Sequence, residues 1–568
     1  MINAFPPGFI MIIGAILIPF LPHIIRQFYM MALILISSYG LTLGFGIHSS
    51  LEFMGYQFIL FQADKLTFPF ALIFHIAAAL NVIYGAHEKD WKQHTSIISY
   101  GGAAIAAIHA GDLFTLFVWW EATAITSVFL ILAGKTSRSY KSAMRYILIQ
   151  VASGMFLLSG AVILLSTEGS ALFTKLDVNS LPGLLIFIAF GIKAAFPFLN
   201  GWLQDSYPEA TVIGTVALSA FTTKLAIFAF ARTFAGTEQL IYIGAMMTVF
   251  PVFFAVIEND LRRVLAFSLN NQLGFMIVAI GIGSELAING AVAHAFAHII
   301  YKSLLFMSMG AVLFRTGTAK ASELGGLFKM MPLTAIFCII GAMSISAFPL
   351  FSGFVAKSFV MSALGIEGLV IVYLVLLFAS AGVLEHSGIK IPFFAFFAHD
   401  AGHKVKEAPL NMLIAMGICA ILCIAIGIFP DYFYQILPYK IDYSAYDMSH
   451  VVGQLQLLMF AVLAFVVLWK LKLYPPEIDS TILNTDWIYR KMIPRILIPL
   501  SELIKSLTNK IEQLINFIFI KIKLYFSNYM IKNKVFDREI GQDTLIIIQV
   551  FVVILIFLIL WQYRNIIL

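Results

Sequence analysis

Seven ionisable side chains in strongly apolar stretches could transfer protons or ions through a membrane: Glu121, Lys193, Lys224, His294, His298, Lys302 and Lys357. An ionisable group at membrane depth costs at least about 2.5–3.5 kcal/mol, and such groups usually face the interior of a helix bundle or a hydrated path. Desolvation favours the neutral amine, so a buried lysine can release and accept protons near neutral pH. These residue types in this setting predict proton transfer.

The first pair of these residues is Glu121 and Lys193. Glu121 lies in DLFTLFVWWEATAITSVFLIL, which has no basic residue close by in the sequence. A carboxylate there must be paired or must hold its proton more tightly. We expect it to pair with Lys193, so that the proton occupancy of one depends on the other. The alternative is a buried glutamate that only binds backbone groups or water.

The stretch GIKAAFPFLNGWLQDSYPEATVIGTVALSAFTTK places Lys193 four residues before Pro197 and Lys224 well inside the next apolar segment. A proline inside a helix breaks or kinks it and frees carbonyl groups that need partners. A turn and a helix separate the two lysines, so they can lie side by side. The alternative for Lys224 is that its long side chain reaches an interface, and its depth in the segment argues against this.

His294, His298 and Lys302 recur every four residues in AVAHAFAHIIYKSLLF, which puts them on one helix face. Such a row can relay protons, since histidine titrates near neutral pH. A metal site with two histidines is disfavoured because the motif offers no carboxylate ligand, and one histidine can simply pack in the core. Lys357 follows the break that Pro349 introduces in AFPLFSGFVAK. It is either an outlet gate or a lysine that reaches the boundary.

The composition identifies a polytopic helical membrane protein. Of 568 residues, 61% are hydrophobic and 12% charged, the mean hydropathy is +0.93, and apolar runs of about 20 residues recur along the chain. Assigning loops alternately to two sides gives four basic residues on one side and fifteen on the other, which predicts that both termini face away from the cytoplasm. The net charge of +6 thus reflects basic cytoplasmic loops and does not indicate a nucleic-acid partner.

Sixteen transmembrane helices are expected, and helices four to eight and nine to thirteen form two sets of five. Repeats with an odd number of spans must be inverted relative to each other, and proline-interrupted segments at corresponding positions point to a site near the midplane. The predicted parts are residues 1–94 (helices 1–3), 95–233 (first repeat), 240–388 (second repeat), 409–470 (helices 14–15), 472–542 (a cytoplasmic-side connector with an amphipathic helix) and 543–568 (a terminal anchor).

Four motifs carry a family resemblance: KAAFPFLNGWLQDSYPEA, DLRRVLAFSLNNQLGF, HAFAHIIYKSLLFMSMGAV and PLFSGFVAK. In this order and spacing the chain resembles the antiporter-like subunits shared by respiratory complex I and the Mrp-type multisubunit cation/proton antiporters, and most closely the D-type subunits. The resemblance covers roughly residues 64–430. It implies an all-α core of fourteen helices with two inverted five-helix repeats, broken seventh and twelfth helices, and buried charges along the middle of the membrane.

The resemblance also assigns residues. It implies that the family's proton-transfer positions are Glu121, Lys193, Lys224, His298, Lys302 and Lys357, and that the charged loop before the tenth helix is Asp260 with Arg262 and Arg263. The chain departs from the family at Gln204, where a proline is usual, and between Ala210 and Thr211, where another proline is missing. These changes put the local loop geometry in doubt.

The expected function is proton translocation in a multisubunit Na+(cation)/H+ antiporter of a bacterial-type cytoplasmic membrane, with small hydrophobic antiporter subunits as partners. The alternative is a proton-pumping subunit of a complex I or membrane-bound hydrogenase assembly. Nothing in the sequence suggests a flavin, quinone or iron–sulfur site, so no cofactor is expected. A non-conducting scaffold is disfavoured because buried lysines are costly. Energy-coupled uptake of inorganic carbon with an unrelated partner stays open.

Overall fold

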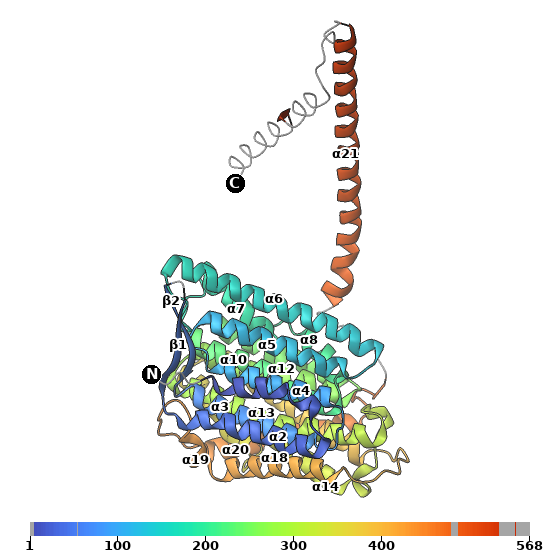
Figure 1. Ribbon diagram of the computed structural model, residues 1–568. Helices are drawn as coiled ribbons and strands as arrows, with labels where there is room; N and C mark the ends of the chain where they lie inside the picture. Colours follow the sequence, from blue (N-terminus) through green and yellow to red (C-terminus); the bar gives the residue numbers. More distant parts are fainter. Residues whose placement is uncertain (1–4, 54, 479–486, 533–550, 553–568) are drawn as a thin grey trace. The chain divides into compact units, whose positions relative to one another are not determined.

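The structure is a computed structural model that describes residues 5–53, 55–478, 487–532 and 551–552 (Figure 1). Two compact units divide the chain, Met1–Asp486 and Trp487–Leu568. Eleven helices in the described residues are long and apolar enough to cross a membrane, and three shorter apolar helices accompany them. The predicted polytopic helical membrane fold is therefore confirmed.

The first unit begins with α1 (Pro7–Ala15), α2 (His23–Ser38) and α3 (Thr67–Tyr84), and between α2 and α3 it contains an element that was not predicted. Strands β1 (Gly46–Phe53) and β2 (Tyr56–Ala63) form an antiparallel hairpin. The hairpin lies across one end of the helix bundle (Figure 1). Ile59 of β2 accepts a hydrogen bond from the Gly111 amide and donates its own to the Asp112 carboxylate, which ties the hairpin to the start of the fifth transmembrane helix.

Two five-membered sets of helices follow. The first set consists of α4 (Trp91–Ile108), α5 (Leu113–Leu132), α6 (Ser137–Glu168), α7 (Leu181–Lys193) with α8 (Gly201–Ser206), and α9 (Val212–Ala220) with α10 (Thr222–Thr233). The second consists of α11 (Gln239–Ile257), α12 (Leu261–Ile282), α13 (Glu285–Thr316), α14 (Pro332–Ile345) with α15 (Ser352–Ile366), and α16 (Val370–Val383) with its continuation. Helices α18 (Leu410–Ile428), α19 (Pro430–Tyr434) and α20 (Met448–Lys470) complete the unit.

The two sets repeat the same local geometry at their second helix. Asp112 caps α5 by accepting the amides two and three residues on, and Asp260 caps α12 in the same way. The next residue in each case donates its amide to a carbonyl 58 positions later, Leu113 to Ala171 and Leu261 to Ala319, at 2.9 Å both times. An N-cap aspartate satisfies amides that a helix start leaves free. The shared spacing supports an internal repeat.

The helix breaks repeat as well. Both occur at Ala-Phe-Pro, residues 195–197 and 347–349. Positive φ angles occur at Ala195 (60°) and Phe198 (67°), and again at Ala347 (58°) and Leu350 (74°). A positive φ costs free energy for a residue with a side chain, so the same costly backbone in both sets reflects a shared design. Pro197 and Pro349 each lie between the two left-handed residues, where the helix direction is interrupted.

The centre of the bundle is formed by the helices that carry most of the predicted charges. In the spans 212–233, 261–282 and 285–316, 94% of the most apolar window is buried, against 11% in α20. A helix that is apolar and buried all round lies in the interior of the bundle. Helices α9, α10, α12 and α13 therefore form the interior, and α20 lies at the periphery of the unit.

One predicted boundary needs correction. The second set was expected to end at residue 388, but its last helix runs from Val370 to Phe397. Within it the regular α-helix ends at Val383 and a π-helical turn follows, Leu384–Ile389. Glu385 and His386, which lie near the expected helix end, are thus inside the helix. Stretches of π-helix are rare and occur frequently at functional sites.

The second unit contains α21 (Ile493–Lys532), a helix of 40 residues with exposed apolar side chains along its length. It occupies the stretch in which the amphipathic helix is predicted. Whether it lies along an interface or a partner stays a prediction. The predicted terminal anchor, residues 543–563, falls almost entirely outside the described residues.

Candidate proton-transfer site

Lys193 is the last residue of α7, immediately before the first break, and it is fully buried. Its Nζ donates to the Trp120 carbonyl oxygen at 2.5 Å and to Thr123 Oγ1 at 2.8 Å, both on α5. The ammonium also lies over the Trp120 ring, 4.3 Å from its centroid. Neutral oxygens and an aromatic face stabilise a cation less than a carboxylate does. Lys193 can therefore lose its proton without breaking a direct ion pair with any described residue.

Glu121 follows Trp120 on α5 and is close enough to Lys193 for an electrostatic interaction. The two side chains do not form an ion pair within 4 Å, because the Lys193 amine is bound to Trp120 and Thr123. Glu121 Oε1 is buried and has no hydrogen-bond partner. The carboxylate lies against Gly154 of α6, where any β-carbon would overlap it. Gly154 thus makes the space that Glu121 occupies.

Lys224 lies at a helix interruption that the sequence analysis did not foresee. Helix α9 ends at Ala220 and α10 begins at Thr222, and Lys224 donates to the Ser219 carbonyl oxygen that the interruption frees. Tyr100 of α4 supplies the missing acceptor for the Thr222 amide at 3.0 Å. Buried backbone groups need such partners. Lys224 itself is fully buried, which excludes the alternative that it reaches an interface.

The predicted row on α13 is entirely buried, with His294, His298 and Lys302 each 0% exposed. His294 Nε2 bonds to Gln272 Oε1 (3.1 Å) and to the Tyr301 hydroxyl (3.0 Å). Among the described residues, neither the two ring nitrogens of His298 nor the amine of Lys302 has a hydrogen-bond partner. Unsatisfied buried polar groups are costly and mark functional positions.

Lys357 of α15 lies next to the second break, as Lys193 lies next to the first. Its Nζ donates to the Ile345 carbonyl oxygen at the end of α14 (3.0 Å) and lies 5.0 Å from the Phe275 ring centroid. His298 is within electrostatic range of Lys224, Lys302 and Lys357. The structure therefore brings the lysines of α10, α13 and α15 together around α13, while Lys193 and Glu121 form a separate pair on α5 and α7.

The predicted loop charges join the two helix sets. Asp260 caps α12, and Arg262 donates to the Ala210 carbonyl oxygen (2.9 Å) and to Thr215 Oγ1. This contact holds the start of α9, where the chain lacks the family's proline. Thr211 compensates as the N-cap of α9. Gln204 is buried, and its side-chain amide has no hydrogen-bond partner.

A polar cavity of about 400 Å³ opens at this junction, with His87, Glu88, Thr136, Glu209, Thr211 and Arg262 among its lining residues. Arg138 forms an ion pair with Glu209 at 2.8 Å, and Arg263 approaches the same carboxylate at 3.6 Å. Burial raises the pKa of Glu209 and lowers that of His87. The cavity thus places titratable groups at the start of α9.

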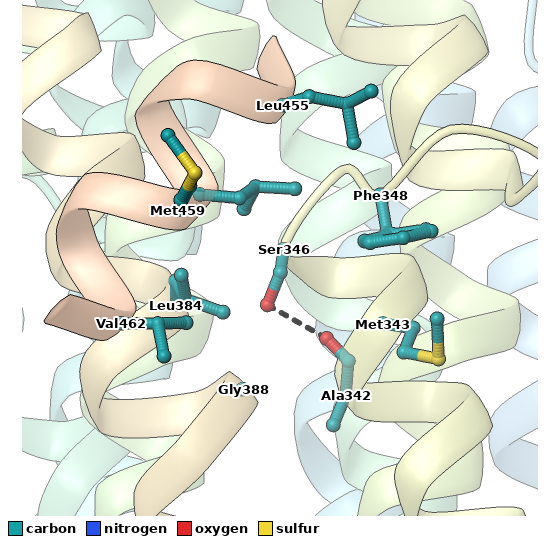
Figure 2. Close-up of a pocket in the computed structure, with 10 residues that line it drawn as sticks. Ala342, Met343, Ser346, Phe348, Leu384, Gly388, Leu455, Met459 and Val462 are labelled. Carbon is teal, nitrogen blue, oxygen red and sulfur yellow. Dashed lines mark hydrogen bonds between the residues drawn. The ribbon is translucent and has the colours of Figure 1, made fainter. Parts of the chain in front are cut away.

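A second cavity, of about 330 Å³, lies where the end of α14 faces α16 and α20 (Figure 2). Its lining residues are Ala342, Met343, Ser346, Phe348, Leu384, Gly388, Leu455, Leu458, Met459 and Val462. Ser346 is the one polar side chain among them and bonds back to the Ala342 carbonyl oxygen (2.7 Å). This lining offers no titratable group, so we do not place the site there.

Three functional candidates escaped the sequence analysis: Glu385, His386 and Lys390. Glu385 and His386 lie near the predicted helix end at residue 388, where an interfacial position is expected, yet His386 and Lys390 are fully buried. His386 and Lys390 are four residues apart, as on one helix face, and the π-helical turn contains Glu385 and His386. A signal was available in the run of three ionisable residues within EHSGIK, inside an apolar segment.

The chain is similar to membrane subunits of known antiporters and hydrogenases. Residues 110–385 match the family model described as "NADH:quinone oxidoreductase/Mrp antiporter, TM". The D-type subunit of the Na(+)/H(+) antiporter of Alkalihalophilus pseudofirmus is 30% identical over 369 residues, which are 60% of this chain and 74% of that protein. Hydrogenase-4 component B of Escherichia coli is 27% identical over 365 residues, 57% of this chain and 54% of that one.

The chain spans only about half of some longer relatives. The A-type subunit of the Na(+)/H(+) antiporter of the same Alkalihalophilus species is 28% identical over 431 residues, 66% of this chain but 53% of that protein. Among solved structures, a chain of the Mrp complex from a Dietzia species superimposes with a TM-score of 0.74 at 22% identity. The superposition covers 87% of this chain and 59% of that one, and it shows a shared fold.

Proposed function

The chain belongs to the family of membrane subunits shared by NADH:quinone oxidoreductases and Mrp antiporters, and on this premise we propose that it is the proton-translocating subunit of a multisubunit Na+(cation)/H+ antiporter. The similarity to the A-type and D-type antiporter subunits supports the antiporter assignment. Both relatives are named as subunits of Na(+)/H(+) antiporters, and we therefore propose Na+ as the coupled cation.

The observation that carries the proposal is a set of fully buried amines that form no ion pair within 4 Å with a carboxylate of the described residues. Lys193, Lys224 and Lys302 are each 0% exposed. The described contacts of Lys193 and Lys224 go to carbonyl and hydroxyl oxygens, and Lys302 has no hydrogen-bond partner. A buried cation without a counter-ion is unfavourable, so each lysine is poised to give up its proton. A scaffold would gain nothing from this cost.

We propose that protons enter by a half-channel and move between Lys193, Lys224, His298 and Lys357. Changes in the Glu121–Lys193 pair drive the movement, because each charge state of Glu121 alters the stability of the Lys193 ammonium. His294 and Lys302 extend the path along α13. The polar cavity at Glu209 and Arg262 supports an entrance at the start of α9.

Replacing Lys193 with alanine tests the proposal. K193A should abolish cation-dependent proton exchange in vesicles, because it removes the amine that carries the proton at the Trp120 carbonyl oxygen and Thr123 Oγ1. The control is K175A, which removes an exposed lysine in the loop before α7 and should leave exchange unchanged. Both variants must assemble with the other subunits. Exchange retained in an assembled K193A complex would refute the assignment.

We propose that the side carrying Arg138, Arg262 and Arg315 is cytoplasmic and that both termini lie on the other side. The bias of basic residues supports this orientation. A cysteine placed at Thr318 should react with an impermeant thiol reagent from the cytoplasmic side only. We further propose small hydrophobic antiporter subunits as partners, with the exposed helix α21 lying along the membrane surface or along one of these partners.

A second candidate function is a proton-pumping subunit of a redox-driven complex. The similarity to hydrogenase-4 component B supports it. Purification from native membranes in mild detergent, followed by mass spectrometry of the associated chains, separates the two. Small hydrophobic partners without redox proteins favour the antiporter, whereas flavin or iron–sulfur proteins would make the same lysines part of a redox-driven pump.

A further inference from the structure

The last helix of the second set, Val370–Phe397, contains a buried cluster of ionisable groups that the proposed path does not use. Its π-helical turn, Leu384–Ile389, holds Glu385 and His386, and Lys390 follows directly. The side chains of His386 and Lys390 are 0% exposed. A π-helical turn inserts one residue into the helix and redirects its side chains. Here it directs an acid, an imidazole and an amine into the protein.

His386 has one satisfied and one free ring nitrogen. The Ser387 hydroxyl donates to Ser268 Oγ of α12 at 2.8 Å, so its oxygen accepts from His386 Nδ1, also at 2.8 Å. Nε2 is then the acceptor nitrogen, and no described residue forms a hydrogen bond with it. His386 is within electrostatic range of Lys302 and Lys357. A buried basic nitrogen without a partner is costly, and binding a proton or water relieves that cost.

Lys390 connects this turn to the loop that precedes α12. Its Nζ donates to the carbonyl oxygens of Val256 (2.6 Å) and Glu258 (2.8 Å) and lies 3.2 Å from Glu477 Oε1. The Lys390 side chain is fully buried, whereas that of Glu477 is 10% exposed. Glu477 therefore joins a buried amine to the outer face of the unit.

The segment after α20 carries Tyr474 and Glu477, which contact two residues of the cluster, Glu385 and Lys390. The Tyr474 hydroxyl donates to Glu385 Oε1 at 2.5 Å. Burial raises the pKa of Glu477, and it raises that of Glu258 to about 7. Arg263 NH1 lies 3.9 Å from Glu258 Oε2, and Asp260 faces the same loop as the cap of α12. Two carboxyl groups whose pKa is raised by burial, Glu258 and Glu477, thus lie beside Lys390, and Glu258 also faces Arg263.

The internal repeat gives this position a counterpart. The last helix of the first set is interrupted between α9 and α10, and the freed Ser219 carbonyl oxygen binds Lys224. The last helix of the second set is interrupted by the π-helical turn that holds His386 and precedes Lys390. An interrupted helix with a buried base at corresponding positions of two halves points to one task in each half.

We propose that the π-helical turn of α16, closed by Tyr474–Glu477, is a proton-access site through which protons pass between the Arg263 face and the buried amines Lys302 and Lys357. The inference rests on the proposed function, since it adds an access route to the same proton path. A proton reaching the Glu477 carboxylate forms the acid, which passes it toward the turn. His386 takes a proton on its free Nε2 and gives it up from the same nitrogen to the neutral amine of Lys302 or Lys357, which restores a neutral ring and leaves the proton on the lysine.

Silver-ion accessibility tests the route without relying on transport. In a complex whose native cysteines, Cys338, Cys419 and Cys423, are replaced by alanine, S387C should react with Ag+ added on the Arg263 face and not from the other face. The matched control is S380C, seven residues earlier in the regular part of α16, where the serine is also buried. S380C should stay unreactive. The inference would be overturned if S387C did not react with Ag+, or if S380C reacted as fast as S387C.

A second variant probes Glu477 directly. E477Q keeps the shape of the side chain but cannot carry a proton, and we expect it to slow exchange on the order of 10²-fold, as for the loss of a positioned proton-transfer group. Its assembly should be normal. Because K193A tests the proposed function separately, the two failures are distinguishable. Loss of exchange in K193A with full exchange in E477Q defeats the access site alone, and full exchange in K193A defeats the function.

Discussion

Replacing Gly154 of α6 with alanine should impair transport although it alters no titratable group. A β-carbon at this position would overlap the Glu121 carboxylate and lie 3.1 Å from Glu121 Cγ, whereas ordinary contacts begin at 3.4 Å. Glu121 is a flexible side chain, so it can yield where a backbone could not. The carboxylate must retreat by roughly 1.5 Å, about the length of one carbon–carbon bond.

The energetic effect follows from the distance dependence of the charge interaction. At an effective dielectric constant of about 20, two unit charges attract by ~4 kcal/mol at 4 Å and by ~3 kcal/mol at 5.5 Å. A displacement of this size relative to Lys193 therefore changes their interaction by about 1 kcal/mol, roughly a fivefold change in the proton equilibrium of the pair. Replacing a glycine inside a helix with alanine favours the helix by up to about 1 kcal/mol. Stability should thus be unchanged or slightly higher.

The assay is cation-dependent proton exchange in vesicles, compared with the thermal stability of the assembled complex. We expect G154A to slow exchange several-fold without destabilising the complex. The control is G417A in α18, where a β-carbon meets Phe337 at an ordinary 3.5 Å. Shortening the acid in the double variant G154A/E121D should restore part of the rate. Wild-type exchange in G154A would refute the claim that the position of Glu121 sets the proton equilibrium of Lys193.

Two further predictions concern stability. Burial raises the pKa of Glu258 from 4.5 to about 7, so the folded protein binds this proton more tightly than the unfolded chain. Its stabilising effect, about 3 kcal/mol at most, is fully present below pH 4.5 and is lost as the pH rises through 7. Thermal unfolding of E258Q should lack this slope, and an unchanged slope would contradict the assignment. Y100F removes the acceptor for the Thr222 amide and should lower stability by about 1–3 kcal/mol. Y432F, at an exposed tyrosine, should be neutral in the same scan.

Much of the helical architecture could be predicted because apolar length determines what a bilayer accepts. The stretches around α5, α12 and α13 are long and apolar, and each has to satisfy its backbone groups internally as a helix. The buried row on α13 followed from the four-residue spacing of His294, His298 and Lys302. The hairpin β1–β2 was missed because eight-residue strands are too short to stand out beside apolar spans of about 20 residues.

The helix interruptions divide into those that the sequence signals and those that it does not. Pro197 and Pro349 remove backbone donors, so breaks at Ala-Phe-Pro were predictable. The interruption at Phe221 contains no proline, and it depends on Tyr100 reaching across from α4 to bind Thr222. Contacts between helices far apart in sequence decide such features, and local propensity does not record them.

The sequence by itself determined that this chain spans a membrane. It also determined which ionisable side chains lie in apolar segments, where their burial is costly. Only the tertiary structure decided what those residues contact. It bonds Lys193 to the Trp120 carbonyl oxygen, uses Gly154 to make space for Glu121, and buries His386 and Lys390 behind Glu477. The physical reason is that the cost of burying a charge depends on residue type and depth, which the sequence shows. The partner that offsets this cost depends on packing between distant segments.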